Sequence, residues 1–335
     1  IVNSVAYSQE HADTIAANMP DYRVICFHSR LISTDRAAIE RELTELVGKK
    51  STCEKRNKLI VVGTQVLEQS LDIDFDYMIT ELCPMDLLLQ RSGRLHRHDR
   101  TRPDKLSEPE LCVLIPEDFS KSVYSGWILT QTEKYLPDKL VIPGCIPELV
   151  GTVYSEPDND EQQTAEYRKY SDEQKEKKQR AKKYCIPSQK IKRSDSTLSD
   201  MIDRRELNND SDGEAAVRDG QETIEVLVLV KTSDTEYSLF SRDAVFDITS
   251  VPDNAQAKLI AKQRLRLPAF FSKSYNFGKT VEILANSMPQ AWRNAKWLKG
   301  EILLLLDGNN EINLLGRTYK YSTERGFEEI KEEES

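Results

Sequence analysis

The feature that most constrains the fold is the alternation of short apolar runs with amphipathic stretches in residues 1–116. The runs "RVICFH", "KLIVVGT" and "YMITEL" are almost wholly apolar, whereas the stretches between them carry apolar residues at helical spacing. Short apolar strands separated by helices are typical of a parallel sheet that has helices on both faces. Residues 1–116 are therefore predicted to form an α/β domain with a doubly wound parallel sheet.

The same pattern predicts where the loops that meet ligands begin. A strand is expected in "IVNSVAY" at the start of the chain, and helices are expected at 9–18, 34–46 and 84–90. In open parallel sheets, ligands bind at the carboxyl ends of the strands. Ser8, His28 and Thr64 are all expected at such ends.

Two further regions follow the predicted first domain. Residues 117–215 are expected to form a helical and charged linker region. Within it, 165–184 mixes charges of both signs and predicts a solvent-exposed helix, with a basic nucleic-acid tract as the alternative. Polar residues at 204–215 indicate a loop or linker. Residues 216–335 are expected to form a small α+β domain, with a hairpin turning at Asp307-Gly308-Asn309.

Composition and charge exclude several classes of protein. The net charge is -9, so a nucleic acid would have to bind through a local basic surface. The six cysteines include no C-x-x-C pair, which indicates reduced, cytoplasmic cysteines in place of disulfides or zinc ligands. No apolar run approaches the roughly 18 residues of a membrane-spanning helix, so no membrane association is expected. Because the chain begins with Ile1 and not with methionine, we expect it to be part of a longer polypeptide.

The stretch "LLLQRSGRLHRHDR", residues 87–100, places arginines at steps of three behind an apolar run, among them Arg91, Arg94 and Arg97. The helix that precedes them is expected to end near Gly93, a natural terminator, so that Gln90, Arg94 and Arg97 project together from its end. Guanidinium groups this close need an anion or a carboxylate among them, and phosphoryl transfer commonly uses arginines to stabilise the γ-phosphate. The alternative is a surface cluster paired with three nearby acids, Asp86, Asp99 and Asp104.

A second candidate site lies in the loop that follows the run "KLIVVGT". Thr64 could offer its hydroxyl group and its backbone N–H to a phosphate of a nucleic-acid backbone. Asp72 could accept a hydrogen bond from a ribose hydroxyl. The simpler alternatives are that Thr64 caps a helix and that Asp72 is an ordinary turn residue.

Together these stretches resemble a known family. "TQVLEQSLDIDFD" followed by "QRSGRLHRH" resembles motifs V and VI of superfamily 2 helicases, and more narrowly those of the CRISPR-associated helicase–nuclease of type I systems, which the Cascade surveillance complex recruits. "NSVAYSQEHA" and "CFHSRLISTDRAAIE" are similar to its motifs IV and IVa. "IPELVGTVYSEP" and "VRDGQETIEVLVL" are similar to its accessory region. The resemblance covers nearly the whole chain and is most specific for 57–103.

The resemblance implies a role for individual residues. Arg94 and Arg97 would be arginine fingers on the phosphates of ATP, and Gln90 would position the attacking water or the γ-phosphate. Three other residues would belong to the nucleotide-binding part: Asp72 near the ribose, with Arg91 and Gly93. Six residues would contact the backbone of single-stranded DNA, namely Thr64, Gln65, Ser8, His28, Ser29 and Arg30.

Parts that such a motor requires are not found in this sequence. The family binds ATP with Mg²⁺ between two RecA-like domains, and the phosphate-cradling loop G-x-x-x-x-G-K-[ST] belongs to the first of them. The nearest match here, "KSYNFGKT" at 273–280, begins with Lys273 where glycine is required and is better read as a turn with an exposed lysine. The nuclease metal centre needs several histidines and acids, but the chain has four histidines in all, so no metal site is predicted.

The expected function is therefore that of a C-terminal part of an ATP-dependent single-stranded DNA translocase in CRISPR antiviral defence. It is expected to be cytoplasmic and to be inactive as an ATPase on its own. Its expected partners are single-stranded DNA, the N-terminal nuclease, the first RecA-like domain and Cascade. Two alternatives stay open: a fragment of another superfamily 2 enzyme such as an RNA helicase, and a non-catalytic module that binds DNA or Cascade.

Overall fold

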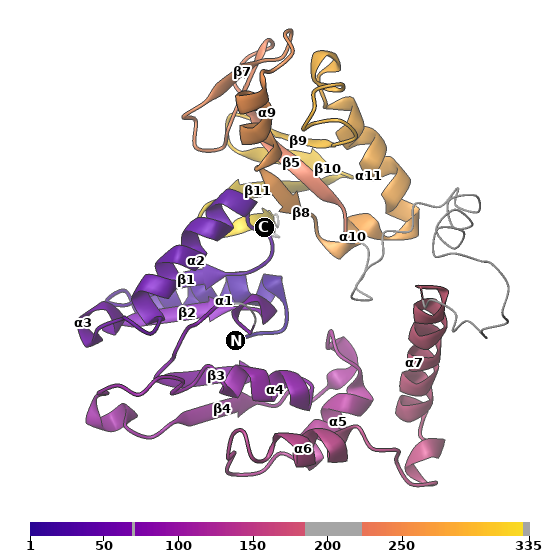
Figure 1. Ribbon diagram of the computed structural model, residues 1–335. Coiled ribbons are helices and arrows are strands. Elements are labelled where there is room, and N and C mark those ends of the chain that lie inside the picture. Colours follow the sequence, from indigo (N-terminus) through magenta and orange to yellow (C-terminus); the bar gives the residue numbers. More distant parts are fainter. Residues whose placement is uncertain (69–70, 185–222, 331–335) are drawn as a thin grey trace, which may run out of the picture. The chain divides into compact units, whose positions relative to one another are not determined.

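The computed structural model describes residues 1–68, 71–184 and 223–330 (Figure 1). The chain divides into two compact units, Ile1–Ser155 with Glu222–Ser335, and Glu156–Gln221. In the described part of the chain, no helix is both long and apolar enough to cross a bilayer. The boundaries of the three regions expected from the sequence stay predictions.

The first region contains two parallel strand pairs. β1 (Arg23–Phe27) pairs with β2 (Leu59–Gly63), and β3 (Tyr77–Glu81) pairs with β4 (Glu110–Leu114). The helices in this region are α1 (Val5–Asn18), α2 (Ser33–Val47), α3 (Cys53–Arg56), η1 (Gln65–Leu67), α4 (Met85–Ser92) and η2 (Asp104–Leu106). The predicted α/β fold is confirmed.

Alternation along β1 explains why helices cover both of its faces. Ile25 and Phe27 pack with Leu43 and other residues of α2, whereas Cys26 packs with Ala12 of α1 on the opposite face. Successive side chains of a strand point to opposite faces, so a strand that is apolar throughout must be covered twice. Helices therefore cover both faces of β1, as the sequence predicts, although the described strands form two separate pairs.

The strand predicted in "IVNSVAY" is wrong, because residues 1–4 form no strand and α1 begins at Val5. The Val2 N–H donates to the Gly63 carbonyl (2.9 Å), and the Ile1 carbonyl accepts from the Glu81 N–H (2.9 Å), so the extended start of the chain connects the two strand pairs. The Ser4 hydroxyl then accepts from the Tyr7 N–H and caps α1. Because this cap starts the helix early, Ser8 lies within α1 and not at the end of a strand.

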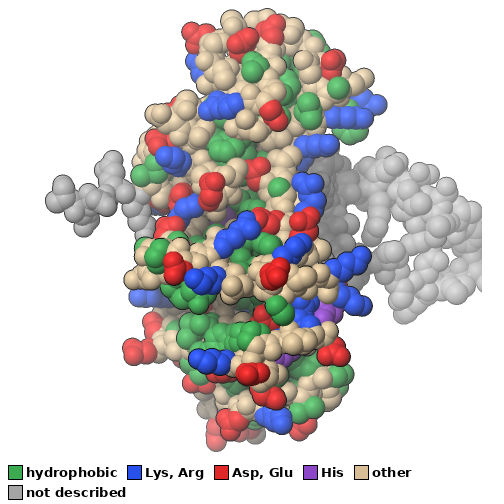
Figure 2. Space-filling view, turned by 90° about the vertical axis from the view of Figure 1, so that its left-hand side faces the viewer, with side chains coloured by type: hydrophobic (Ala, Val, Ile, Leu, Met, Phe, Trp, Pro, Cys, Tyr) green, Lys and Arg blue, Asp and Glu red, His purple; other side chains and the backbone are tan. Residues whose placement is uncertain are grey.

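A hollow of about 1040 Å³ lies between the two strand pairs. It is lined by residues of β2, β3 and α1. Its exposed apolar side chains include Tyr77, Ile79 and Leu114. Figure 2 looks onto this face, where hydrophobic side chains gather around a recess in the lower half of the view.

The next two helices extend the first unit. α5 (Gly126–Lys134) follows η3 (Phe119–Lys121), and α6 (Ile146–Val153) packs its Val153 against Met85 and Leu89 of α4. The second unit contains η4 (Glu161–Gln163) and α7 (Ala165–Tyr184). Most described side chains of α7 are exposed, which confirms the solvent-exposed helix. The predicted loop at 204–215 lies outside the described residues.

The C-terminal region is built on a five-stranded sheet. β7 (Val245–Asp247), β6 (Glu236–Ser238), β5 (Glu225–Lys231) and β8 (Arg264–Arg266) follow one another across it, and β9 (Leu303–Leu306) pairs in parallel with β5. A separate antiparallel sheet consists of β10 (Glu311–Leu314), β11 (Arg317–Ser322) and β12 (Gly326–Glu329). The helices are α9 (Asn254–Ala261), α10 (Ala269–Ser272), α11 (Ser274–Asn286) and η5 (Gln290–Trp292).

The predicted hairpin around Asp307-Gly308-Asn309 is wrong in its pairing. The turn forms, with the Asn310 N–H donating to the Asp307 carbonyl, but the strands on its two sides join different sheets. The reason is burial: Leu303, Leu304 and Leu306 are all inaccessible to solvent. An apolar run of this kind suits a strand covered on both faces beside β5 better than an outer hairpin strand.

The two tryptophans of the segment "QAWRNAKWL" have different surroundings. Trp292 is fully buried in edge contacts with Tyr237 and Phe246, so it packs in the core. Trp297 is 42% exposed, and the amino groups of Lys258 and Lys296 lie 5.3 and 5.8 Å from its ring centre.

Candidate functional site

The arginine stretch is positioned by α4 and by the acidic loop that runs from β2 to β3. α4 buries Leu88 and Leu89 and ends where the Gly93 N–H donates to the Leu89 carbonyl (3.0 Å). The chain then pairs with Phe75, whose N–H donates to the Arg94 carbonyl (2.8 Å) and whose carbonyl accepts from the His96 N–H (3.0 Å). The residues after Gly93 are therefore held against the loop "DIDFD".

Arg94, Arg97 and Asp72 come together at this place. Arg94 Nη2 donates to the Glu68 carbonyl (2.8 Å), and Arg97 Nε donates to Asp72 Oδ1 (2.8 Å). Burial lowers the pKa of Arg94, and the neighbouring Arg97 guanidinium lowers it further. The hydrogen bond from Arg97 holds the pKa of Asp72 below its usual value. Both partners of the Arg97–Asp72 pair are about half exposed, at 43% and 53% of their side chains, and Gln90 is exposed one helical turn earlier.

Arg91 differs from the other two arginines because its side chain is fully buried. Its Nε donates to Glu68 Oε1 (2.7 Å), its Nη1 to Thr80 Oγ1 (2.7 Å) and its Nη2 to Asn3 Oδ1 (3.0 Å). Burial raises the pKa of Glu68, and the Arg91 charge opposes this rise. Arg91 thus joins α4 to β3 and to the start of the chain. The ATP contact that the resemblance implies for Arg91 would require this network to open.

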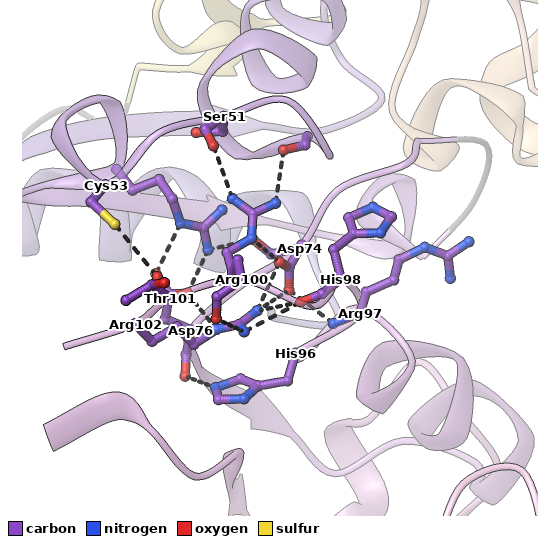
Figure 3. Close-up of polar contacts among 12 residues, drawn as sticks. Ser51, Cys53, Asp74, Asp76, His96, Arg97, His98, Arg100, Thr101 and Arg102 are labelled. Atoms are coloured by element: carbon purple, nitrogen blue, oxygen red, sulfur yellow. Dashed lines mark hydrogen bonds and ion pairs between the residues drawn. The ribbon is translucent and has the colours of Figure 1, made fainter. Parts of the chain in front are cut away.

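A buried ionic cluster fixes the chain that follows the arginines (Figure 3). The Asp74 carboxylate is fully buried; it accepts from Arg102 Nη2 (2.8 Å) and from the Arg97 N–H (2.9 Å). Arg100 Nε also lies 2.7 Å from Asp74, although its N–H does not point at the oxygen. Asp76 accepts from Arg102 Nε (2.9 Å). The loop carrying Arg97 is therefore held at several points.

The acids that pair with these arginines are not the ones the alternative interpretation named. Arg97, Arg100 and Arg102 pair with Asp72, Asp74 and Asp76. Asp86, by contrast, accepts from the Tyr154 hydroxyl (2.6 Å). The sequence interpretation missed Asp74, Asp76, Arg100 and Arg102. The signal was available in "DIDFD", where acids alternate with apolar residues.

Five of the six residues expected on the DNA side follow the carboxyl ends of β1 and β2, and the sixth, Ser8, lies in α1. Phe27 is the sheet partner of Gly63, so His28 and Thr64 follow neighbouring strand ends as expected. The backbone N–H of Thr64 already donates to the Phe27 carbonyl (3.2 Å), which corrects the view that it is available to a phosphate. The alternative of a helix cap is not seen either, because the Thr64 side chain makes no cap bond to η1.

Gln65 lies beside Thr64 and connects three segments. Its Nε2 donates to the Asn3 carbonyl (3.1 Å) and to the Tyr124 hydroxyl (2.9 Å). The side chain is therefore held in place next to the strand end. Its exposure is intermediate, so part of it stays accessible.

Ser8 and His28 are buried, whereas Ser29 and Arg30 are partly exposed. The Ser8 hydroxyl donates to the Val5 carbonyl (2.7 Å). His28 Nε2 lies 3.0 Å from the Arg325 carbonyl, and His28 Nδ1 accepts from the Arg30 N–H (3.1 Å). Because a carbonyl can only accept, Nε2 carries the proton and the ring is neutral. In this structure the side chains of Ser8 and His28 are not available to a DNA backbone.

Burial of His28 predicts a pH-dependent stability. Burial lowers the pKa of His28 from 6.5 to about 4. Between these values the unfolded chain binds a proton that the folded chain does not, so the free energy of unfolding falls as the pH is lowered. Between pH 7 and pH 5 the contribution of His28 is expected to decrease by about 2 kcal/mol. Denaturant unfolding of the wild type and of His28→Gln at both pH values measures it; parallel changes in the two proteins would contradict the assignment.

The segment "KSYNFGKT" does not form the predicted turn. Gly278 and Lys279 lie within helix α11, and the Thr280 hydroxyl donates to the Asn276 carbonyl (2.9 Å) as helical threonines do. A phosphate-cradling loop precedes its helix, so this segment lacks that geometry. Across the residues that the structure describes, no group of three or more His, Cys, Asp or Glu side chains could hold a metal ion.

Comparison with known proteins agrees with this arrangement. Residues 1–100 match the family described as CRISPR-associated nuclease/helicase Cas3, C-terminal, and residues 218–327 match the Cas3 C-terminal domain. The chain is 38% identical to the CRISPR-associated nuclease/helicase Cas3 of Streptococcus thermophilus over 97% of this chain and 37% of that protein. It is 29% identical to the CRISPR-associated endonuclease/helicase Cas3 of Escherichia coli K12 over 75% of this chain and 27% of that protein.

Solved structures show the same fold. The crystal structure of T. fusca Cas3-AMPPNP superimposes with a TM-score of 0.77 over 97% of this chain and 38% of that chain, at 23% identity. A chain of the CRISPR RNA-guided surveillance complex, pre-nicking, superimposes with a TM-score of 0.70 over 97% of this chain and 40% of that chain, at 24% identity. The chain thus spans less than half the length of these relatives. It belongs to the Cas3 family of CRISPR-associated nuclease/helicases and corresponds to their C-terminal part.

Proposed function

We propose that this chain supplies the second RecA-like half of an ATP-driven, single-stranded DNA translocase in CRISPR antiviral defence. The observation that carries the proposal is the grouping of Asp72 with Arg94 and Arg97, which directly follow α4: Arg97 donates to Asp72, and its charge lowers the pKa of Arg94. Motifs of this composition form the nucleotide side of the helicases that the sequence resembles.

The cluster fits the phosphates of ATP on physical grounds. Arg94 has lost solvation and lies beside a second positive charge, and both effects lower its pKa. An anion between Arg94 and Arg97 would relieve both costs. The Arg97–Asp72 pair is exposed, and exposed ion pairs contribute little stability. Phosphate could therefore displace Asp72, whose carboxylate would then be available to a ribose hydroxyl.

Each residue near the nucleotide would have a distinct task. Arg94 and Arg97 would stabilise the negative charge that phosphoryl transfer develops, and Gln90 would orient the water or the γ-phosphate. ATP with Mg²⁺ supplies the transferable phosphoryl group. The phosphate cradle and the Mg²⁺ ligands would belong to the first RecA-like domain.

The DNA contact would lie at the ends of β1 and β2. Ser29 and Arg30 are partly exposed there, and Gln65 is held beside Thr64. Contacts to phosphate and sugar carry no sequence information, which suits a motor that moves along any strand. The proposal extends to the partners expected from the sequence: the N-terminal nuclease, the first RecA-like domain and Cascade, all in the cytoplasm. The fold shared with a chain of a CRISPR surveillance complex supports Cascade as a partner.

The proposal predicts that residues 1–335 alone do not hydrolyse ATP. The purified chain is expected to release no phosphate above the buffer rate, with or without single-stranded DNA. The reason is that the loop that holds the ATP phosphates opposite Arg94 and Arg97 would belong to the first RecA-like domain. A phosphate-release assay with a range of ATP concentrations measures this. DNA-stimulated turnover that disappears in Arg94→Ala would show that the chain holds a complete site, which would contradict the proposal.

A further inference from the structure

We propose that the β11–β12 hairpin is a positioning element for the DNA-contacting loop at 28–30, with Arg325 and Gly326 as its positioning residues. The inference rests on the proposed contact between this loop and the DNA backbone. It adds that the geometry of the loop is set by residues almost 300 positions later in the chain.

The turn of the hairpin is anchored to α1 through Arg325. Its carbonyl accepts from Gln9 Nε2 (2.7 Å) and from His28 Nε2 (3.0 Å). Its guanidinium group donates a hydrogen bond to the Gln9 carbonyl (3.0 Å) and forms an ion pair with Asp13. One residue of the turn therefore holds both the helix and the first residue of the loop.

Hydrogen bonds from the hairpin also hold the backbone carbonyl of Arg30 directly and its backbone N–H through the His28 ring. The Arg30 carbonyl accepts from the Phe327 N–H (2.8 Å). The Arg30 N–H donates to His28 Nδ1 (3.1 Å), and the opposite nitrogen of that ring is bonded to Arg325. Because both peptide groups of Arg30 are held directly or through one ring, the hairpin determines where its side chain starts.

An anion would stabilise the charge of the Arg30 side chain. Burial lowers the pKa of its guanidinium group, which means that its charge has lost solvation. A phosphate of the DNA backbone would restore favourable interactions for this charge. A small displacement of the loop would move the guanidinium group away from a strand that has a fixed path.

Gly326 allows the close approach between the hairpin and the loop. Its φ of +66° favours glycine, and a Cβ atom there would lie 2.2 Å from the Arg30 carbonyl oxygen and 2.7 Å from His28 Cε1. Both neighbours are held by hydrogen bonds, so neither can move without disturbing the loop. Alanine at 326 would therefore push the hairpin away from residues 28–30.

Gly316 offers a matched control in the neighbouring turn between β10 and β11. Its φ is +79°, so alanine there is strained in a similar way, but nothing lies within 4 Å of the Cβ position. Gly316→Ala thus reports the effect of backbone strain alone, whereas Gly326→Ala adds the collision with the loop.

The test compares Gly326→Ala and Gly316→Ala in the full-length protein that contains this region. The concentration of single-stranded DNA that half-stimulates ATP hydrolysis is expected to rise on the order of tenfold in Gly326→Ala and to stay unchanged in Gly316→Ala. The rate at saturating DNA should be similar in both. If Gly326→Ala does not fold, Arg325→Ala, which removes the side-chain bonds to Gln9 and Asp13 that anchor the hairpin, should raise the same concentration, and Arg325→Lys should partly restore it.

Two outcomes would overturn the inference: an unchanged half-stimulating concentration in folded Gly326→Ala, or an equal rise in both glycine variants. Arg30→Ala separates this failure from that of the proposed function. If Arg30→Ala raises the half-stimulating concentration and Gly326→Ala does not, only the positioning role is wrong. If Arg30→Ala leaves the half-stimulating concentration unchanged, the proposed DNA contact is wrong. The positioning role, which rests on that contact, is then wrong as well.

Discussion

Arg94→Ala and Arg97→Ala, introduced separately into the complete motor, are each expected to lower DNA-stimulated ATP hydrolysis by about 10³-fold or more. Each substitution removes a charge that lies beside the second guanidinium group and that would stabilise the transferring phosphoryl group. The affinity for single-stranded DNA should stay within about twofold, because the DNA-contacting loop lies at the ends of β1 and β2. Phosphate release and fluorescence anisotropy measure the two effects.

Two controls sharpen this result. Arg293→Ala removes an exposed arginine far along the chain and should leave turnover unchanged. Arg94→Lys keeps the charge but loses the planar fork of donors, so it should recover only a small part of the activity. Unchanged turnover in Arg94→Ala or in Arg97→Ala would remove that residue as an arginine finger.

Arg91→Ala is expected to act on stability, with a loss of about 3–5 kcal/mol in the free energy of unfolding. It would leave the Glu68 carboxylate buried without its cation and would also remove the bonds to Thr80 and Asn3. Replacing both charges, as in Arg91→Met with Glu68→Leu, should restore much of this stability because no unpaired charge remains. Denaturant unfolding measures both variants.

The same experiment distinguishes a structural Arg91 from one that contacts ATP. A folded Arg91→Ala protein with wild-type stability and no ATP hydrolysis would show that Arg91 acts on the nucleotide, as the resemblance implies. A destabilised protein that still turns over below its unfolding temperature would show that its task is to hold α4 against β3.

Local sequence patterns were enough to predict most elements of the first domain. β1 and β2 are apolar on both faces, and each is followed by a polar loop. The sequence therefore predicts that both segments are strands and predicts where each strand ends. The start of α1 was misjudged because the Ser4 cap outweighs the apolar character of "IVNSVAY". The partner of β9 could not be predicted, because β5 lies more than 70 residues earlier and pairing depends on the whole sheet.

The site was predictable to a similar extent. Arg94, Arg97 and Asp72 were identified from the sequence and do come together. The burial of Arg91 was not predicted, because its hydrogen-bond partners come from three different segments of the chain. The bond between His28 and the Arg325 carbonyl spans 297 positions and has no local signal in the sequence.

The central claim is that this chain holds the arginine fingers while another domain holds the phosphate cradle. Mixing residues 1–335 with the separately purified upstream part of the protein, and measuring DNA-stimulated phosphate release, tests it most directly. The account predicts that turnover appears only in the mixture and is lost when the 1–335 partner carries Arg94→Ala. DNA binding by the mixture without any turnover, or equal turnover with the Arg94→Ala partner, would contradict it.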